Sequence, residues 1–346
     1  MKHINLLLLI SLILVACSGK HNSADNDGEV VTMRHARLVK VMKYADKARI
    51  DILNPWDTTK YLRSICVDIP VQRAAIYTAT HASLVAELGV ADRIGGVFDS
   101  KYITNPNIKN ALATKTIRDL GASNVVNIEG VMDLNPDLFM PSPYENQAGY
   151  GRLEQLGIPI MECADYMEVS PLARAEWIRV YGILFGVEER ADSLFNVVEK
   201  RYNDLKSLAG KARNKPRLLT ERPVSGTWHV PCGGSTTGIL YRDAGADYIF
   251  SDIEGSGARA LSIEKVLDKA IDADLWLVKS FGVLTQQQLT ADYPLLQHIP
   301  ARLLVCNTEE VAFFEETPFH PEYLLENLIA LFHPELDIKP QHVYFK

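Results

Sequence analysis

Short apolar runs alternate along this chain with longer segments in which apolar residues recur every three to four positions. Short runs of apolar and β-branched residues are typical of buried strands, and the longer period is typical of amphipathic helices. Strands that alternate with helices predict parallel sheets built from β-α-β units, and therefore an α/β fold. The expected strands are Ala74–Tyr77, Ile94–Val97, Asp137–Met140, Ile158–Glu162, Arg217–Thr220, Tyr248–Phe250, Leu275–Val278 and Leu303–Cys306.

One long segment, 168–213, interrupts this alternation and has no strand character. Within it, residues 187–210 place apolar side chains on one helical face and charged side chains on the other. A helix of about 23 residues is about 34 Å long, which is enough to cross from one lobe to another. We therefore expect an N-terminal lobe, 36–167, then this helical segment with a lobe-spanning helix, then a C-terminal lobe, 214–346. The alternative is a helix packed on one lobe alone.

The two expected lobes share a local sequence pattern. In each lobe a helix that ends on a glycine, Gly89 or Gly245, leads into a strand. Further along, an Ile-Glu-x-Val helix start leads into an Asp-Leu strand, and the glutamates of these starts are Glu129 and Glu264. Because only two copies occur, the pattern indicates a duplicated lobe and not a solenoid repeat.

The N-terminus begins with a basic residue and an apolar run that ends in small residues. This arrangement is typical of a signal peptide, expected over 1–16, and the run is too short to span a hydrocarbon layer about 30 Å thick. Leu14-Val15-Ala16-Cys17 resembles the lipobox of bacterial lipoproteins, in which the cysteine is acylated. We expect Cys17 to carry a membrane anchor and 17–35 to be a flexible tether. The alternative is an ordinary signal peptide with an incidental cysteine.

The composition of the chain and the absence of several motifs argue against several classes of function. Acidic residues outnumber basic ones, 43 to 36, and no basic cluster stands out, so nucleic acid is not an expected partner. The sequence lacks a phosphate loop, a His-Glu-x-x-His zinc motif and a Gly-x-Ser-x-Gly elbow. We expect no resident metal, no intrinsic cofactor and no enzymatic activity. The disulfide state is left open for Cys66, Cys163, Cys232 and Cys306, which are not at CxxC spacing.

The order of lipobox, tether, lobe, long helix and lobe resembles class III substrate-binding proteins of ABC importers, the group that carries iron–siderophores, haem and cobalamin. The likeness covers roughly residues 70–335. Ala86-Glu-Leu-Gly-Val-Ala-Asp-Arg-Ile-Gly-Gly-Val is similar to the family's helix-to-strand turn, and Asn127-Ile-Glu-Gly-Val-Met-Asp-Leu-Asn-Pro-Asp-Leu is similar to its strand entry.

The resemblance implies two α/β lobes with small mostly parallel sheets, joined by a single long backbone helix around a largely preformed cleft. It implies an extracytoplasmic (periplasmic), lipid-anchored monomer that delivers an iron–siderophore, cobalamin or haem ligand to an ABC importer permease. Glu129 and Glu264 match the family's docking glutamates, which meet arginines on the permease. Both glutamates also have a simpler interpretation as first-turn residues of capped helices, since Asn127 and Ser262 precede them.

Ligand contacts are expected at the C-terminal ends of the strands, where parallel sheets open their crevices. Aromatic faces with a few polar tips suit a bulky, partly apolar chelate, and arginines suit ligand carboxylates. The candidate ligand-binding residues are Thr80, His81, Tyr102, Tyr144, Glu145, Arg222, Trp228, His229, Arg259 and Phe281.

Several of these candidates also have simpler interpretations, and two further functions stay open. His81 follows Thr80 at a helix start, so it can cap the helix or pack locally. Trp228 lies in a glycine-bracketed stretch and is expected to be an exposed loop residue. One alternative function is haem binding with Tyr144, His81 or His229 as an axial ligand. The other is an extracytoplasmic enzyme on the same scaffold, which requires a titratable cluster in the cleft.

Overall fold

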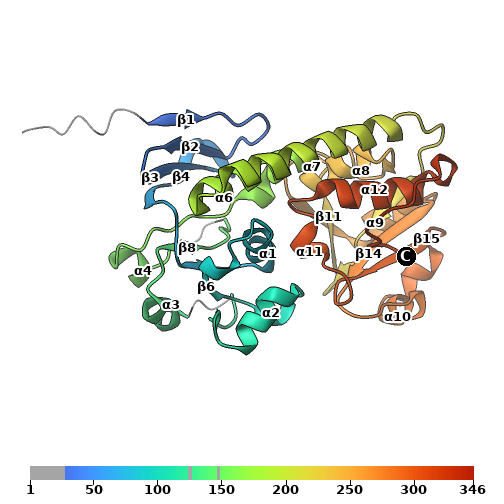
Figure 1. Ribbon diagram of the computed structural model, residues 1–346. Coiled ribbons are helices and arrows are strands. Elements are labelled where there is room, and N and C mark those ends of the chain that lie inside the picture. Colours follow the sequence, from blue (N-terminus) through green and yellow to red (C-terminus); the bar gives the residue numbers. More distant parts are fainter. Residues whose placement is uncertain (1–27, 124–126, 146–148) are drawn as a thin grey trace, which may run out of the picture.

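The computed structural model describes residues 28–123, 127–145 and 149–346 of the 346-residue chain. It shows two α/β lobes side by side, with one long helix running along both (Figure 1). This is the fold class that the alternation of strands and helices predicts. The signal peptide over 1–16 and the acylated Cys17 lie outside the described residues and stay predictions.

The N-terminal lobe is built on a parallel sheet with strand order β7-β6-β5-β8. β5 and β8 are buried along their whole length, which is why they read as continuous apolar runs. The strands are β5 (Ala74–Ile76), β6 (Ile94–Val97), β7 (Arg118–Asp119) and β8 (Leu138–Met140), and the helices are α1 (Ala79–Glu87), α2 (Pro106–Ala113), α3 (Ile128–Leu134) and α4 (Arg152–Gln155).

The C-terminal lobe repeats this plan with a parallel sheet of order β12-β9-β14-β15. A smaller antiparallel sheet of order β10-β11-β13 lies beside it. The strands are β9 (Arg217–Thr220), β10 (Pro223–Val224), β11 (Thr227–Pro231), β12 (Asp247–Tyr248), β13 (Ala258–Ser262), β14 (Leu275–Ser280) and β15 (Arg302–Asn307), and the helices are α8 (Thr236–Asp243), α9 (Ile263–Ala270), α10 (Gln286–Asp292), α11 (Phe313–Glu316) and α12 (Pro321–Phe332).

The duplication is visible in the order of the strands. β6, β5 and β8 of the first lobe occupy the places of β12, β9 and β14 of the second. The expected strand Ile158–Glu162 is reduced to a single bridge between Ile160 and Phe139, beside β8, where the second lobe has β15. The helices α1 and α8 both end before a glycine with positive φ, Gly89 at 82° and Gly245 at 83°. A residue with a side chain adopts this left-handed conformation at a cost, so glycine ends both helices.

The helix α7 (Glu188–Ala209) contacts both lobes and follows α5 (Pro171–Ala175) and α6 (Trp177–Phe185). At its start, the Arg190 guanidinium donates to the Glu87 carbonyl at the end of α1. Further along, the Tyr202 hydroxyl donates to Asp243 of α8 at 2.9 Å. The predicted lobe-spanning helix is therefore confirmed. Its buried face consists of Ala191, Phe195, Val198, Tyr202, Leu205 and Ala209.

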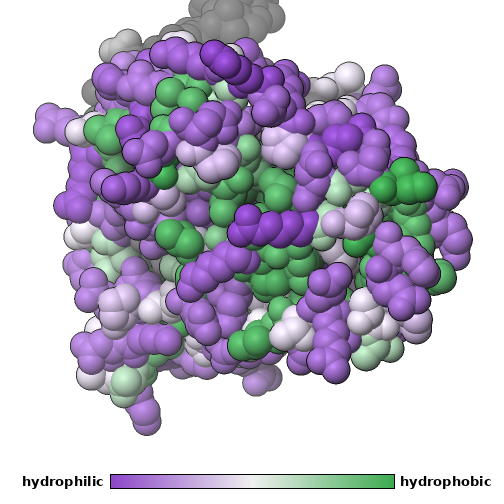
Figure 2. All heavy atoms as spheres, turned by 90° about the vertical axis from the view of Figure 1, so that its right-hand side faces the viewer, coloured by the Kyte–Doolittle hydropathy of each residue, from purple (hydrophilic) through white to green (hydrophobic). Residues whose placement is uncertain are grey.

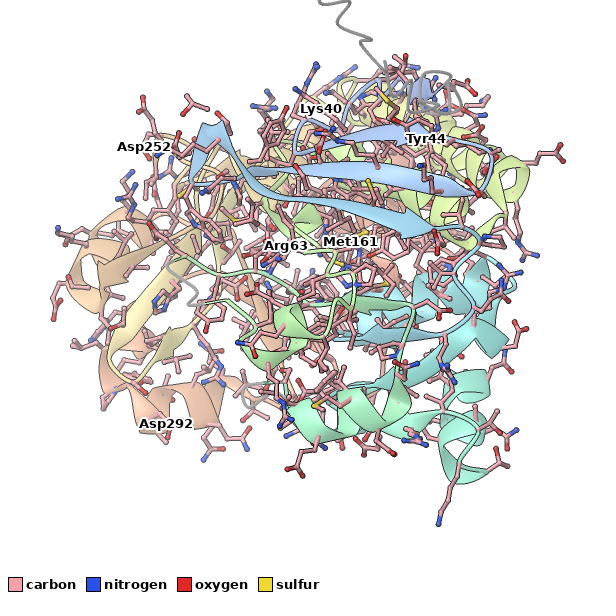
Figure 3. The ribbon with its side chains drawn as sticks, turned by 90° about the vertical axis from the view of Figure 1, so that its left-hand side faces the viewer. Lys40, Tyr44, Arg63, Met161, Asp252 and Asp292 are labelled. Carbon is pink, nitrogen blue, oxygen red and sulfur yellow. The ribbon has the colours of Figure 1, made fainter. Side chains whose placement is uncertain are left out.

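An antiparallel sheet that the sequence analysis did not predict covers the N-terminal lobe (Figures 1 and 3). Its strands follow the order β1-β2-β3-β4, and Lys40 and Tyr44 in Figure 3 lie at its outer side. From β4, Arg63 reaches Glu154 of α4 at 2.8 Å, which ties the sheet to the lobe below. The strands are β1 (Glu29–Val31), β2 (Val39–Lys43), β3 (Lys47–Asn54) and β4 (Asp57–Asp68).

The described part of the expected tether, residues 28–35, is held in place by a buried carboxylate. Glu176 accepts hydrogen bonds from the backbone N–H groups of Arg34, His35 and Ala36, at 2.8, 2.6 and 2.8 Å. Its side chain is fully buried, and satisfied backbone donors make such burial tolerable. The prediction that the tether extends to residue 35 is therefore wrong, because β1 and these contacts begin before that point.

Within the described residues, no helix is both long enough and apolar enough to cross a membrane. The outer edge of β15 pairs with Lys346 through reciprocal backbone hydrogen bonds to Val305. Figure 2 views the molecule from the side of the C-terminal lobe. On this face, hydrophobic residues are exposed between hydrophilic ones.

Candidate functional site

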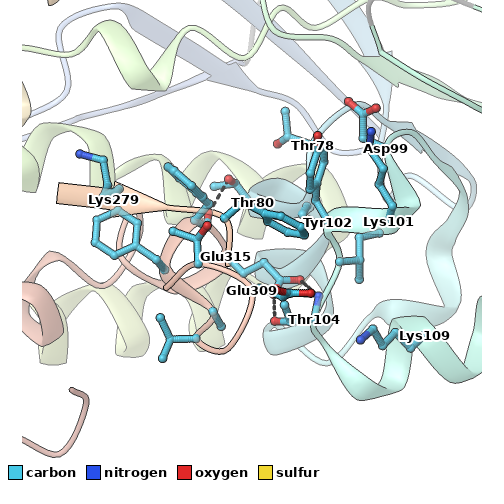
Figure 4. A pocket seen from close by; sticks show the side chains of 18 of the residues that line it. Thr78, Thr80, Asp99, Lys101, Tyr102, Thr104, Lys109, Lys279, Glu309 and Glu315 are labelled. Carbon is cyan, nitrogen blue, oxygen red and sulfur yellow. Dashed lines mark hydrogen bonds between the residues drawn. The ribbon is translucent and has the colours of Figure 1, made fainter. Parts of the chain in front are cut away.

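A cavity of about 680 Å³ lies between the two lobes (Figure 4). Its walls come from the loops after β5 and β6 in the first lobe and after β14 and β15 in the second, together with α11. These loops all follow the carboxyl ends of parallel strands, where the sequence analysis places the ligand contacts. The volume is within the range of about 300–1,000 Å³ that small-molecule sites occupy.

Aromatic rings from both lobes line this cavity. Tyr102 follows β6 and Phe281 follows β14, and the two rings meet edge to face with 5.8 Å between their centroids. Their residues are 50% and 61% exposed, so the pair lies at the mouth of the cavity and not in its depth. We call Tyr102 and Phe281 the aromatic pair. The other rings of the lining are Tyr77, Phe313 and Phe314.

Charged groups of both signs are distributed around the lining. Lys279 forms an ion pair with Glu221, which neutralises it. Lys101 places its ammonium 4.6 Å from the centroid of the Tyr102 ring. Opposite charges therefore meet in one site, and this suits a ligand with several polar groups better than a simple anion. The charged lining residues are Asp99, Lys101, Lys109, Lys279, Glu309 and Glu315.

Tyr77 is anchored at the base of the first lobe's wall. Its hydroxyl donates to the carbonyl of Ser123, and burial together with the Asp99 carboxylate raises the pKa of this phenol. A raised pKa disfavours the phenolate that binds ferric iron, so Tyr77 is better suited to hydrogen bonding than to metal ligation.

Glu315 of α11 joins the lobes beside the cavity, and we call its contacts the Glu315 clasp. Its carboxylate accepts the backbone N–H of Thr104 at 2.9 and 3.0 Å and that of Asn105 at 3.2 Å. The hydroxyls of Thr104 and Ser83 donate to the same carboxylate. The residue is 7% exposed. A hydrogen bond to a charged group contributes about 1.5–3 kcal/mol, whereas an aromatic pair adds about 0.5–1.5 kcal/mol beyond its buried area.

A second polar contact crosses the lobe boundary at His320. Its imidazole is 2.9 Å from Glu87 of α1 through Nε2 and 2.9 Å from Glu322 through Nδ1. Burial alone would lower the pKa of His320, but the hydrogen bonds to Glu322 and Glu87 raise it to about 9. The histidine is therefore a cation at neutral pH and links acidic groups of both lobes.

Three of the predicted ligand-binding residues line the cavity, namely Thr80, Tyr102 and Phe281. The Thr80 hydroxyl also donates to the Phe314 carbonyl at 2.6 Å, across the lobe boundary. The structure therefore brings these three side chains together from helix α1 and from the loops after β6 and β14.

The prediction that Trp228 is an exposed loop residue is wrong. It lies in β11, is fully buried, and packs against the tilted ring of Trp276 with 5.9 Å between ring centroids. Its indole N–H donates to the Thr220 carbonyl at 3.0 Å, which satisfies the polar atom of the ring. A fully buried indole cannot contact a ligand in the cleft, so its role is in the core.

His81 is buried as well, at 3% exposure, and takes the structural role that the sequence analysis left open. Its Nδ1 is 2.8 Å from the Thr78 hydroxyl and its Nε2 is 2.8 Å from Asp165. Asp165 is also bound by Arg174 at 2.9 Å. The imidazole therefore joins the N-cap of α1 to a buried ion pair and does not line the cavity.

The remaining candidates lie outside the cavity lining. His229 and Arg259 are exposed on the paired strands β11 and β13. Arg222 follows β9 and is half-buried. Tyr144 and Glu145 are exposed in the loop after β8, and Tyr144 lies close enough to Tyr77 to contribute to its raised pKa.

The predicted docking glutamates occupy equivalent positions in the two lobes. Glu129 and Glu264 are each the second residue of their helix, α3 or α9, and both are exposed. The N-cap side chains of Asn127 and Ser262 each accept a backbone N–H of the first turn. Hydrogen bonds from its own backbone and from Ser262 lower the pKa of Glu264.

Lys101, Lys109 and the Glu315 clasp were not predicted from the sequence. Lys101 precedes a predicted residue, so the strand-end rule could have found it. Across 28–123, 127–145 and 149–346, no group of three or more His, Cys, Asp or Glu side chains could hold a metal ion. In the same part of the chain the cysteines are free thiols.

Known proteins are similar to this chain in sequence and fold. The model of the periplasmic binding protein family matches residues 74–302. The uncharacterized lipoprotein MJ0878 of Methanocaldococcus jannaschii is 22% identical over 385 residues, which cover 95% of this chain and 92% of the relative. A periplasmic haem-binding protein from Pseudomonas aeruginosa shares the fold with a TM-score of 0.59 and 20% identity, over 80% of this chain and 97% of that one. An ABC-type Fe3+-hydroxamate transport protein from Saccharomonospora viridis has a TM-score of 0.61 and 17% identity, over 82% and 98%.

Proposed function

Because this chain belongs to the periplasmic binding protein family, we propose that it is a lipid-anchored, extracytoplasmic substrate-binding protein of an ABC importer. Its ligand is an iron chelate or a corrinoid, which it captures in the cleft and delivers to the permease. The observation that carries this proposal is the cavity of about 680 Å³ between the lobes, with rings and charged groups contributed from both sides.

The composition of the cavity favours a large ligand that is partly apolar and carries polar groups at its edge. The rings of Tyr102, Phe281 and Phe314 offer apolar faces, and each of these residues is at least half exposed. The hydroxyl of Thr80 and the ammonium of Lys109 offer polar contacts at the periphery. A chelate whose metal is already enclosed needs only such contacts, and no protein ligand to the metal.

Docking and anchoring rest on residues outside the cleft. Glu129 and Glu264 offer one exposed carboxylate per lobe at matching places, which suits a permease surface with two basic contacts. Exposed ion pairs contribute only about 0.2–1 kcal/mol each, so they orient the complex more than they hold it. Cys17 carries the acyl chains in this proposal, and the name of the lipoprotein relative supports it.

Haem bound by an axial Tyr144, His81 or His229 receives no support from the geometry. Among the described residues, no histidine lines the cavity, and Tyr144 is not part of the lining. An enzyme on this scaffold has one feature in its favour, the chain of contacts from Thr78 through His81 to Asp165. Arg174 occupies the second oxygen of Asp165, however, and the Thr78 hydroxyl caps α1. Both facts favour a structural role for that network.

Ligand titration tests the proposal directly. Purified protein is titrated with haemin, cobalamin and ferric hydroxamate siderophores while its tryptophan fluorescence is followed. We expect saturable one-to-one quenching by one of these classes. Absence of saturation with all of them would refute chelate binding.

Charge reversal tests the docking role. The double variant Glu129→Arg, Glu264→Arg is expected to lose uptake in cells by at least tenfold, while its ligand affinity stays unchanged. The variant Glu189→Arg, at an exposed position on α7, serves as the matched control and should transport normally. Normal uptake by the double variant would show that these carboxylates do not dock the permease.

A further inference from the structure

The mouth of the cavity and its side wall are built differently, and this difference bears on which ligands enter. The aromatic pair, Tyr102 and Phe281, bridges the two lobes at the mouth through an edge-to-face contact of the two rings. Both residues are at least half exposed, so neither ring is held by packing on all sides. Exposed side chains change rotamer within nanoseconds, whereas lobe motions take microseconds or longer.

The backbone beneath each ring is fixed. Thr104, two residues after Tyr102, is bound to the other lobe through both its N–H and its hydroxyl by the Glu315 clasp. Gly282, directly after Phe281, donates its N–H to the Asn307 side chain of β15 at 2.9 Å. Neither ring can therefore move far by displacement of its loop.

Lobe separation is restrained at the side wall of the cleft. The clasp holds a buried carboxylate against backbone donors, and His320 links to Glu87 of the first lobe. Hydrogen bonds to charged groups are about twice as strong as neutral ones, and breaking them here would leave the buried Glu315 carboxylate without its donors. The long helix α7 further resists bending between the lobes.

We infer that Tyr102 and Phe281 form a gate that opens by ring rotation, so that the two side chains set the size of the ligand that enters the cleft. The inference rests on the proposed function and assigns these two residues a role in specificity. Because the surrounding backbone does not yield, the opening available to a ligand is limited to the space that the rings vacate. Compact chelates pass between the rotated rings with a small energy barrier. Bulky chelates enter only when the lobes separate, which happens more rarely.

A thiol placed inside the cavity reports on this gate without any ligand. Ala79 lines the cavity at the first turn of α1, where the helix N-terminus lowers the pKa of a thiol and makes it reactive. The variant Ala79→Cys is made in a Cys66→Ser background, since Cys66 is an exposed thiol and the other described cysteines are buried. Its modification rate is measured with methyl methanethiosulfonate, which is small, and with fluorescein maleimide, which is bulky.

We expect the small reagent to react rapidly and the bulky one at least tenfold more slowly. Adding Phe281→Ala should raise the rate of the bulky reagent at least fivefold and change that of the small reagent less than twofold. Tyr102→Phe keeps the ring and is the matched control, which should leave both rates unchanged. Equal rates for the bulky reagent with and without Phe281→Ala would overturn the gate.

The two proposals fail in different ways. A protein that binds no chelate but shows this dependence on reagent size keeps the gate and loses the proposed function. A protein that binds a chelate but admits both reagents equally keeps the function and loses the gate.

Discussion

The lobe boundary has two sides that differ in chemistry. On one side, Glu315 and His320 bring ionisable groups into buried contact with the first lobe. At the mouth of the cleft, Tyr102 and Phe281 meet through exposed rings. Buried polar contacts resist separation because each broken bond leaves a group without a partner, whereas exposed rings part at little cost. The lobe boundary is therefore rigid at its polar side, around Glu315 and His320, and adaptable at its aromatic side, around Tyr102 and Phe281.

The Glu315 clasp should dominate the stability of the boundary. In Glu315→Ala the N–H groups of Thr104 and Asn105 lose their acceptor, and we expect the free energy of unfolding to fall by about 2–4 kcal/mol. Glu315→Gln keeps one acceptor oxygen but not the charge, and should lose about half as much. Urea unfolding followed by tryptophan fluorescence measures both values.

Glu309→Ala is the control for this measurement. Glu309 lines the same cavity and is exposed, so its removal should change stability by less than about 0.5 kcal/mol. A Glu315→Ala protein as stable as Glu309→Ala would show that the clasp does not hold the lobes together.

His320 should give the boundary a pH dependence of intermediate size. The pKa of His320 is raised to about 9 in the folded protein, above the usual value of about 6.5 in the unfolded chain. Its stabilising contribution is therefore complete below pH 6.5 and is lost as the pH rises to 9. Glu87 is partly exposed, so we expect a loss of only about 1–2 kcal/mol over this window.

The groups that face His320 are Glu87 of α1, Glu322 of α12 and Tyr323. The Tyr323 ring stacks on the imidazole with 4.6 Å between ring centroids. Free energies of unfolding at pH 6.5, 7.5 and 9 test the prediction. His320→Gln should flatten the profile, and His229→Gln, an exposed histidine on β11, should leave the slope as it is. An unaltered slope in His320→Gln would assign the pH dependence to other groups.

The parts of the fold that the sequence predicted are those in which a single pattern runs long enough. α7 keeps its helical period over 22 residues, and β5 and β9 are short runs buried on both faces. The N-terminal sheet also carried a usable pattern, because Ala48, Ile50 and Ile52 alternate with polar residues along β3. That alternation could have been recognised.

Other features depend on contacts that no local pattern contains. Thr104 and Glu315 are 211 positions apart and meet only when both lobes are complete. Trp228 reads as a loop residue because glycines flank it, yet pairing of β11 with β13 turns it inward to the Thr220 carbonyl. Strand ends could be located from the sequence, and so Thr80, Tyr102 and Phe281 were placed near the cavity. Which strand-end side chains point into it depends on the tertiary structure.

The aromatic side of the boundary should contribute least to stability. Phe281→Ala removes a ring that is 61% exposed and meets Tyr102 edge to face. Because so exposed a ring buries little area, we expect its pair energy to be at the low end of the range for aromatic pairs. The free energy of unfolding should therefore fall by about 0.5 kcal/mol. Urea unfolding beside Glu315→Ala provides the direct contrast, with Tyr61→Ala, an exposed aromatic on β4, as the control for ring loss. A loss as large as that of Glu315→Ala would mean that the rings hold the lobes together, and the distinction between a rigid polar side and an adaptable aromatic side would have to be abandoned.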